Sequence, residues 1–115
     1  MKMVTAIIQP TRVEVVKKTL EGLGVSGLTV TDARGVGRQR GRTEIYRGHE
    51  YTVDLVPKVK IEVAVEENIV DRVIDAVVKA ARTGTEGKIG DGKIFVTGIE
   101  QAVRIRTGET GSAAI

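Results

Sequence analysis

Glycine and basic side chains gather in three stretches whose composition suits anion binding better than core packing. The first covers residues 35–56 and reads GVGRQRGRTEIYRGHEYTVDLV. From residue 34 to 60 there are seven basic residues and three acidic ones, a net charge of +4 against +3 for the whole chain. Connections longer than about 12 to 15 residues are uncommon in compact domains unless they are functional or disordered. We interpret this stretch as a functional loop, with a solvated hairpin tip as the alternative.

The second stretch is GTEGKIGDGK at residues 84–93, which has the glycine and lysine spacing of a phosphate-binding P-loop. A true P-loop needs Ser or Thr after the lysine and must open a helix, whereas Ile94 follows here and begins a predicted strand. We therefore reject a P-loop NTPase. Phosphate binding by this stretch is still expected, because glycines let backbone N–H groups approach phosphate oxygens and Lys93 adds a positive charge.

The third stretch is RIRTGE at residues 104–109, in which two arginines are separated by one residue. If the segment is extended, Arg104 and Arg106 point the same way and form a fork for phosphate or carboxylate. An exposed edge strand protected by charge would have the same sequence pattern. Both interpretations stay open on the residues alone.

Hydrophobic periodicity predicts the elements that position these stretches. Runs of β-branched residues predict four strands, at residues 4–8, 28–33, 59–65 and 94–99. Apolar residues at helical spacing predict two helices. The first begins at residue 13 and is ended by Gly22 and Gly24. The second has Asn68 as its N-cap and is ended by Gly84. The order predicts a ferredoxin-like α+β fold, a double βαβ with a four-stranded antiparallel sheet. Two helices cover only one face, so we expect the other face to pack against further subunits.

Composition excludes several classes of function. The chain of 115 residues has no cysteine and one histidine, so disulfides, thiolate metal sites and cysteine nucleophiles are excluded. A signal-peptide core and the roughly 18 apolar residues needed to span a bilayer are both missing. We expect one cytoplasmic domain over residues 1–115, with an aliphatic core because only three residues are aromatic. With no visible nucleophile and base, carboxylate pair or metal cluster, we expect a protein that is not an enzyme.

Together these motifs resemble the PII family of nitrogen-regulatory signal-transduction proteins. The resemblance rests on TVTDARGVGRQRGRTEIYRGHEYTVDLVPKVKIEVAV, AARTG, KIGDGKIFV and EQAVRIRTGE, and it covers nearly the whole chain. It implies a homotrimer with a nucleotide in each of three clefts between neighbouring subunits. It also implies a signalling T-loop between strands 2 and 3 at about residues 37–55, a B-loop at about 83–93 and a C-terminal loop at about 102–108.

The resemblance also assigns ligand-binding residues. ATP or ADP would be bound by Thr29, Gly37, Arg38, Gln39, Ala64, Gly90, Asp91, Gly92 and Lys93, and by Arg104 and Arg106 of the neighbouring subunit. 2-Oxoglutarate would be bound by Gly37, Gln39, Arg40, Gly41 and Lys58. Gln39 would bind Mg²⁺ together with the ATP phosphates and 2-oxoglutarate. A dianion beside a polyphosphate needs such cations to offset repulsion.

Regulation through the T-loop is implied in the same way. Tyr51 lies where many bacterial relatives are uridylylated, and Arg47 matches the arginine that plugs the ammonium channel in relatives that bind it. The implied partners are therefore an ammonium channel, enzymes of nitrogen metabolism and a uridylyltransferase. Contact with a membrane would occur only through the channel, nucleic acid is not an expected partner, and a weak ATPase activity would be the only catalysis.

Two departures from the family pattern bear on ligand binding. The B-loop reads TGTEGKIGDGK where TGKIGDGK is usual, which adds about three residues, among them Glu86 near the predicted phosphate site. Gln9 stands where relatives often have Arg or Lys, so we expect weaker 2-oxoglutarate binding. A sensor of ATP and ADP alone is the main alternative. An RNA-binding ferredoxin-like module is less favoured, because the strands lack the aromatic platform on which such modules stack bases.

Overall fold

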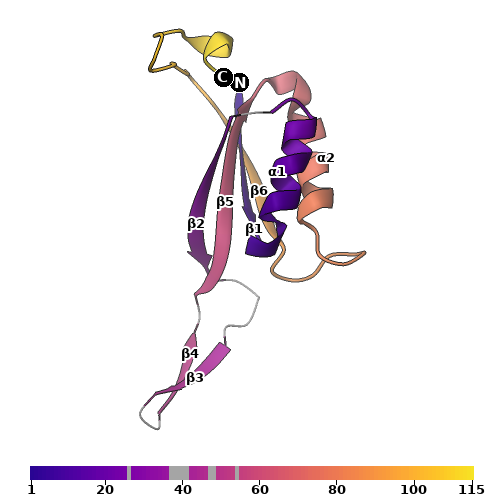
Figure 1. Cartoon of the computed structure of the whole chain (residues 1–115), viewed down its shortest axis with the longest axis vertical. Helices are drawn as coiled ribbons and strands as arrows, with labels where there is room; N and C mark the ends of the chain where they lie inside the picture. Colours follow the sequence, from indigo (N-terminus) through magenta and orange to yellow (C-terminus); the bar gives the residue numbers. More distant parts are fainter. Residues whose placement is uncertain (26, 37–41, 47–48, 54) are drawn as a thin grey trace.

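The computed structural model describes residues 1–25, 27–36, 42–46, 49–53 and 55–115, and for residues 42–53 it describes the backbone alone. Along the chain the elements are β1 (Lys2–Ile8), α1 (Val13–Gly22), β2 (Leu28–Gly35), β3 (Arg42–Tyr46), β4 (His49–Val53), β5 (Val56–Val65), α2 (Val70–Ala81) and β6 (Gly92–Gly98). Short 3₁₀ turns precede both α-helices, at Pro10–Arg12 and Glu67–Ile69, and a third, Gly111–Ala114, lies near the C-terminus. Figure 1 shows the arrangement.

The main sheet has the strand order β2-β5-β1-β6, and each neighbouring pair is antiparallel. This is the order of a double βαβ unit, so the predicted ferredoxin-like α+β fold is confirmed. The hairpin of β3 and β4 forms a second sheet that continues beyond the end of β2 and β5 (Figure 1). That hairpin lies within the long connection that the sequence predicted.

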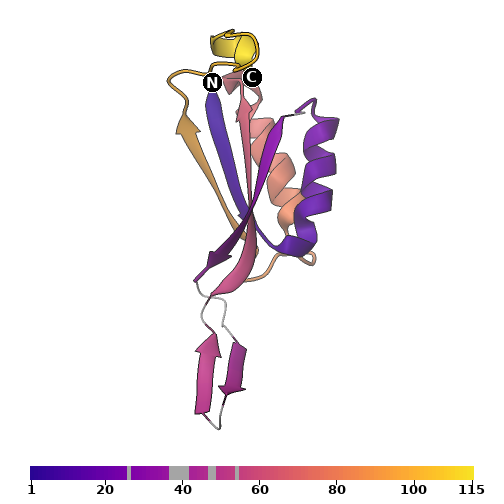
Figure 2. The ribbon, with the colours of Figure 1, turned by 60° about the vertical axis from the view of Figure 1, so that its left-hand side comes forward.

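Both helices cover the same face of the sheet (Figure 2). Alternate residues of the two central strands point toward the helices and are almost fully buried, namely Val4, Ala6, Ile8, Val59, Ile61, Val63 and Val65. They pack against Val16 and Leu20 of α1 and against Val73 and Val77 of α2. The core is aliphatic, as the near absence of aromatic residues predicted.

The opposite face of the sheet is bare in the single chain and carries a mixture of side chains. Ile7 and Phe95 lie on it, and Phe95 keeps 53% of its surface exposed. Lys60 and Glu62 lie beside them and form an ion pair at 3.8 Å. This face is therefore part apolar and part charged, a composition suited to ligands or to another subunit. Among the described residues, no helix has the length and apolar content to cross a membrane.

Two predicted helix ends were wrong. Asn68 does not cap α2, since it lies within the 3₁₀ turn and Ile69 occupies the N-cap position without a side-chain cap. The helix ends at Ala81 rather than near Gly84. The helix stops there because the backbone N–H and the hydroxyl of Thr83 donate hydrogen bonds to the Asp91 carboxylate, eight residues further along the chain, instead of continuing the helix.

Candidate functional site

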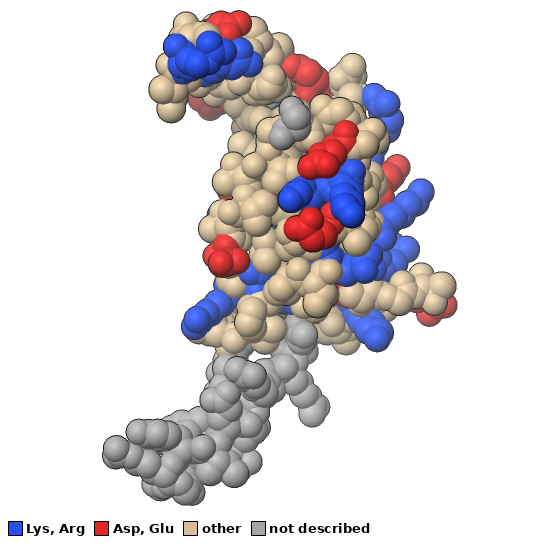
Figure 3. Space-filling model, viewed as in Figure 1, with Lys and Arg blue, Asp and Glu red and all other residues tan. Residues whose placement is uncertain are grey.

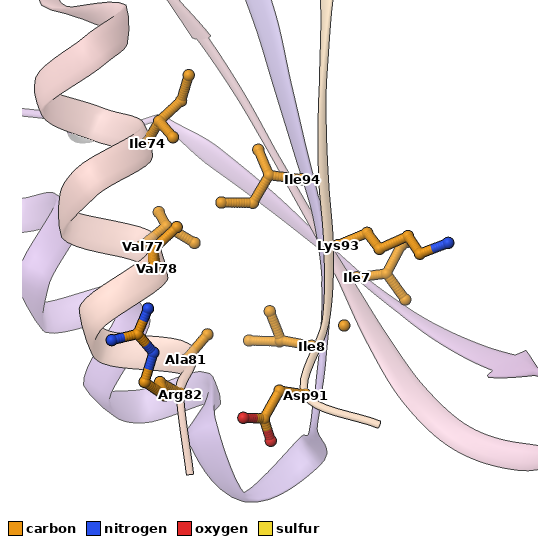
Figure 4. A pocket seen from close by; sticks show the side chains of 11 residues that line it. Ile7, Ile8, Ile74, Val77, Val78, Ala81, Arg82, Asp91, Lys93 and Ile94 are labelled. Carbon is orange, nitrogen blue, oxygen red and sulfur yellow. The ribbon is translucent and has the colours of Figure 1, made fainter. Parts of the chain in front are cut away.

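A cleft of about 680 Å³ opens on the bare face of the sheet, where the turn that precedes β6 meets β5 and the end of β2. Three lysines, Lys58, Lys88 and Lys93, are among its lining residues. The rest of the lining comprises Asp91, three glycines and the apolar residues Ile7, Val36, Val56, Ile89 and Phe95. Figure 4 shows that Lys93 and Ile7 extend away from α2, to the side of the sheet where the cleft lies.

The backbone of the turn before β6 requires glycine at two positions. Residues 88–91 form a turn in which the Asp91 N–H donates to the Lys88 carbonyl at 3.2 Å, and Gly90 has a φ of 98°. Gly92 has a φ of 110°, and a Cβ there would lie 1.6 Å from the Ile7 carbonyl oxygen. In the sequence, these glycines were expected to let backbone N–H groups approach phosphate oxygens. The structure adds a packing reason at Gly92, because the start of β6 lies very close to the Ile7 carbonyl of β1.

Asp91 braces this turn through both carboxylate oxygens. Oδ1 accepts a hydrogen bond from the Thr83 hydroxyl at 2.6 Å, and Oδ2 accepts from the backbone N–H groups of Thr83 and Lys88 at 3.0 and 2.8 Å. Burial alone would raise the pKa of the Asp91 carboxyl, but these hydrogen bonds and the charge of Lys58 lower it below its ordinary value. The carboxylate is therefore ionised at neutral pH.

Lys58 lies deep in the cleft, with only 9% of its surface exposed. Its amine donates a hydrogen bond to the Gly90 carbonyl, which also accepts one from Gln9 Nε2 at 2.8 Å. Burial lowers the pKa of Lys58, and the negative charge of Asp91 partly opposes that shift. A negatively charged ligand in the cleft would favour the charged amine further.

The structure brings together one group of the predicted site residues and separates another. Gly90, Asp91, Gly92 and Lys93 line the cleft with Lys58. Thr29 and Ala64 lie on the same bare face but away from the cleft. Thr29 is on the edge strand β2, and Ala64 is near the end of β5 that is farther from Lys58. Thr29, on edge strand β2, is about 14 Å from edge strand β6, because three strand spacings of about 4.8 Å separate them.

Arg104 and Arg106 lie on the C-terminal segment beyond the opposite end of the sheet, where basic atoms gather at the top of the molecule (Figures 1 and 3). The condition set for their fork, an extended segment, is not met, because residues 104–108 form a turn. The Gly108 N–H donates to the Arg104 carbonyl at 2.7 Å and closes a turn, while the Arg104 guanidinium pairs with Glu109 at 2.7 Å. Between the arginines, Ile105 is 99% exposed.

Several predicted residues lie outside the described part of the chain: Gly37, Arg38, Gln39, Arg40, Gly41 and Arg47. Tyr51 lies in β4, paired with Glu44 of β3, and its side chain is also outside the description. The Mg²⁺ site at Gln39 and most of the 2-oxoglutarate site therefore remain predictions.

Sequence reasoning missed seven residues of the cleft, namely Ile7, Gly35, Val36, Val56, Lys88, Ile89 and Phe95. Lys88 had a signal, because it belongs to the GKIGDGK run that was singled out for phosphate chemistry. Ile7 and Phe95 could have been found from strand alternation, which places both on the face opposite to Ile8 and Ile94, which pack in the core.

A smaller hollow of about 240 Å³ lies on the helix side of β6 (Figure 4). Aliphatic side chains of α2 face those of β1 and β6 across it, including Ile74, Val77 and Ile94, with Arg82 and Asp91 at one end. The charged residues of this lining, Arg82, Lys93 and Asp91, give one net positive charge, against two in the larger cleft. The larger cleft is therefore the candidate site.

The fold and the site define the class of protein: a small ferredoxin-like α+β protein with a lysine-containing cleft at the base of a long loop. The family model described as nitrogen regulatory protein P-II matches residues 1–109. Relatives named nitrogen regulatory protein P-II are 56% identical in Azospirillum brasilense, 55% in Bradyrhizobium diazoefficiens and 52% in Haemophilus influenzae, each over 115 residues and the full length of both chains. The chain therefore belongs to the P-II family of nitrogen regulatory proteins, as its motifs predicted.

Family membership defines the broad role. P-II proteins are signal-transduction regulators that act on partner proteins in nitrogen metabolism and are not enzymes, and this chain is a regulator of that kind. The match covers the B-loop region and Arg104 and Arg106 as well as the core strands.

Proposed function

We propose that this protein senses nitrogen, carbon and energy status by binding ATP or ADP, and 2-oxoglutarate with Mg²⁺, and controls partners through its T-loop. The observation that supports this most directly is the cleft, where Lys58, Lys88 and Lys93 surround a glycine-rich turn. Lysine residues suit a polyphosphate, and the apolar surfaces of Ile7 and Phe95 suit a nucleobase or ribose. A volume of about 680 Å³ is in the range of small-molecule sites.

The residues of the cleft divide naturally between two anions. The backbone of Gly90 and Gly92 and the amine of Lys93 would hold phosphate oxygens. Lys58, on the neighbouring strand β5, would pair with the distal carboxylate of 2-oxoglutarate. Mg²⁺ would supply positive charge between the two anions, with Gln39 as its proposed protein ligand.

We place the nucleotide between subunits of a homotrimer. Support comes from the start of β6, which includes Lys93, and the C-terminal segment, which includes Arg104: they lie toward opposite ends of one subunit (Figure 1), so that one nucleotide touching both needs two copies. The bare face with its exposed Phe95 supplies surface for such packing. Sedimentation should give three times the chain mass of 12.3 kDa, and a 12.3 kDa species would refute this assembly.

The outputs follow from the T-loop, whose β3–β4 hairpin projects from the body of the subunit (Figure 1). We propose that Arg47 contacts an ammonium channel, that Tyr51 is modified by a uridylyltransferase, and that enzymes of nitrogen metabolism are further targets. The protein would act in the cytoplasm and meet the membrane only through the channel.

Calorimetry tests the ligand assignment. ATP and ADP should compete for one site per subunit, and 2-oxoglutarate should bind only when MgATP is present. Lys93→Gln should weaken both nucleotides, since a charge-assisted hydrogen bond contributes roughly 1.5 to 3 kcal/mol. Lys79→Gln, on the exposed face of α2, is the matched control and should bind normally.

Each alternative has its own outcome. Nucleotide binding without any 2-oxoglutarate response would leave a sensor of ATP and ADP alone. Binding of labelled RNA with no binding of nucleotide would overturn the proposal in favour of the RNA-binding module. Release of inorganic phosphate from bound ATP would show the weak ATPase activity.

A further inference from the structure

The Asp91 carboxylate holds together two points of the loop between α2 and β6, Thr83 and Lys88, and we call this junction the neck of the loop. The backbone nitrogens of Thr83 and Lys88 lie 3.0 and 2.8 Å from the same oxygen, Asp91 Oδ2. They are therefore no more than about 5.8 Å apart, the sum of these two distances, although four residues lie between them in sequence. Residues 84–87 leave the neck and return to the same place, and we call them the excursion.

The excursion has little contact with the cleft. None of its residues lines the cleft, whose lining on this loop begins at Lys88. Thr85 and Glu86 are exposed, and Figure 1 shows the loop projecting sideways below α2. The close approach is at Gly87, where a Cβ would lie 3.1 Å from both Arg82 Cγ and Asp91 Oδ2.

On the other side of the neck, residues 88–93 are held at several points, and we call them the anion turn. The Asp91 N–H donates to the Lys88 carbonyl while the Lys88 N–H donates to the Asp91 carboxylate, so the turn is closed twice. The Gly90 carbonyl accepts hydrogen bonds from Gln9 and Lys58. These bonds fix the backbone of the residues that line the cleft.

The Asp91 carboxylate faces away from the proposed ligand. Figure 4 shows it turned toward Ala81 and Arg82 at the end of α2, while Lys93 extends to the other side of β6. Both of its oxygens already accept hydrogen bonds from the loop itself. A direct contact with phosphate would add like-charge repulsion, whereas the contact with the Lys88 N–H holds the first residue of the anion turn in place.

We propose that Asp91 is a positioning residue that closes the loop at Thr83 and Lys88, so that the anion turn is preformed and the excursion is separable from ligand binding. The ligand part of this inference rests on the proposed nucleotide function, whereas the closure rests on the hydrogen bonds alone. Residues at the excursion can then vary in number without changing the cleft. Glu86, although anionic, does not act on the bound phosphates.

Amide hydrogen exchange of the ligand-free protein tests the closure. Asp91→Asn keeps the shape of the side chain but replaces one accepting oxygen with a donor. Exchange at the Thr83 and Lys88 amides should accelerate about tenfold, the effect of losing roughly one hydrogen bond, while amides of β5 and α2 keep their protection. Asp75→Asn, exposed on α2, is the control. A loss of protection spread over the sheet would indicate a general structural role, and unchanged exchange at both amides would refute the closure.

Deletion of residues 85–87 tests separability. It leaves the sequence TGKIGDGK, in which two residues span up to about 7 Å, enough to cover the closed neck. Exchange at Thr83 and Lys88 and affinity for MgATP should stay within about twofold of the parent, whereas Asp91→Asn should weaken MgATP about tenfold.

The two assays distinguish failure of this inference from failure of the proposed function. If the parent protein binds no MgATP but Asp91→Asn exposes the two amides as expected, the nucleotide assignment is wrong and the closing role of Asp91 is upheld. If the deletion variant loses MgATP affinity as strongly as Asp91→Asn does, the excursion belongs to the site and separability is refuted.

Discussion

Gly92→Ala should disrupt the junction of β1 and β6 more than any change of similar size elsewhere on the sheet. Gly92 pairs with Ile8 at the first position of β6, and its φ is 110°. A Cβ there would lie 1.6 Å from the Ile7 carbonyl oxygen and 2.7 Å from the Ile7 carbonyl carbon. Backbone atoms of a central strand cannot turn aside as the end of a flexible side chain can.

The size of the effect follows from two contributions. Ordinary contact begins near 3.4 Å, so the start of β6 must move by about 1.8 Å, which disrupts one or two ladder hydrogen bonds at roughly 1 kcal/mol each. An alanine held at positive φ adds about 1 to 3 kcal/mol of strain. Together we expect a loss of about 2 to 5 kcal/mol in the free energy of unfolding, a large part of the 5 to 15 kcal/mol typical of domains.

Urea unfolding followed by circular dichroism measures this loss, at several protein concentrations so that any change in assembly is seen. Gly98→Ala, at the other end of the same strand, is the matched control, because its Cβ would meet only the Lys2 amine at 3.9 Å. The control should change stability by less than about 1 kcal/mol. If Gly92→Ala lowered the free energy of unfolding as little as the control does, the close contact with the Ile7 carbonyl would not be the reason for glycine at this position.

Three further predictions concern the ligands. Arg104→Ala should weaken ATP and ADP together by at least tenfold in calorimetry, even though it also breaks the pair with Glu109, and unchanged affinities would leave that ion pair as the whole role of Arg104. Gln9→Arg should tighten 2-oxoglutarate in the presence of MgATP by adding a cation near Lys58, an idea that an unchanged dissociation constant would exclude. Burial lowers the pKa of Lys58 below 10.5, so between the two values the unfolded chain binds more protons and the free energy of unfolding rises with pH. Binding of a carboxylate should reverse that shift and take up protons at alkaline pH, as measured by calorimetry in buffers of different ionisation enthalpy, and Lys58→Met should abolish the uptake.

The fold could be predicted because local and global signals agree in the core. Val4, Ala6 and Ile8 alternate on one face of β1, and Val16 and Leu20 repeat at helical spacing on α1. In such segments burial depends only on periodicity, which the sequence displays directly. The ends of α2 were mispredicted because they depend on partners that are distant in sequence, such as the bond from Thr83 to Asp91.

The part of the candidate site that forms a continuous motif could be predicted, and the part that several strands assemble could not. Lys93 and its glycines are visible as a motif, and the family resemblance supplied Lys58, whereas Ile7 and Phe95 enter the cleft only because three strands lie side by side. The fork of Arg104 and Arg106 required an extended chain, and the structure shows a turn at these residues instead. Gly108, with a φ of 72°, permits a tight turn there, and Glu109 is close enough to pair with Arg104.

The hydrogen bonds of the Gly90 carbonyl suggest how the two proposed ligands are coupled. Lys58 and Gln9 both donate to this oxygen, which belongs to the anion turn. A carboxylate that recruits the Lys58 amine would remove one of these donors, and Gln9 would remain to satisfy the carbonyl. The position of the anion turn, and hence phosphate affinity, would then depend on whether the carboxylate is bound. Because such coupling is reciprocal, MgATP and 2-oxoglutarate must change each other's affinity by the same factor.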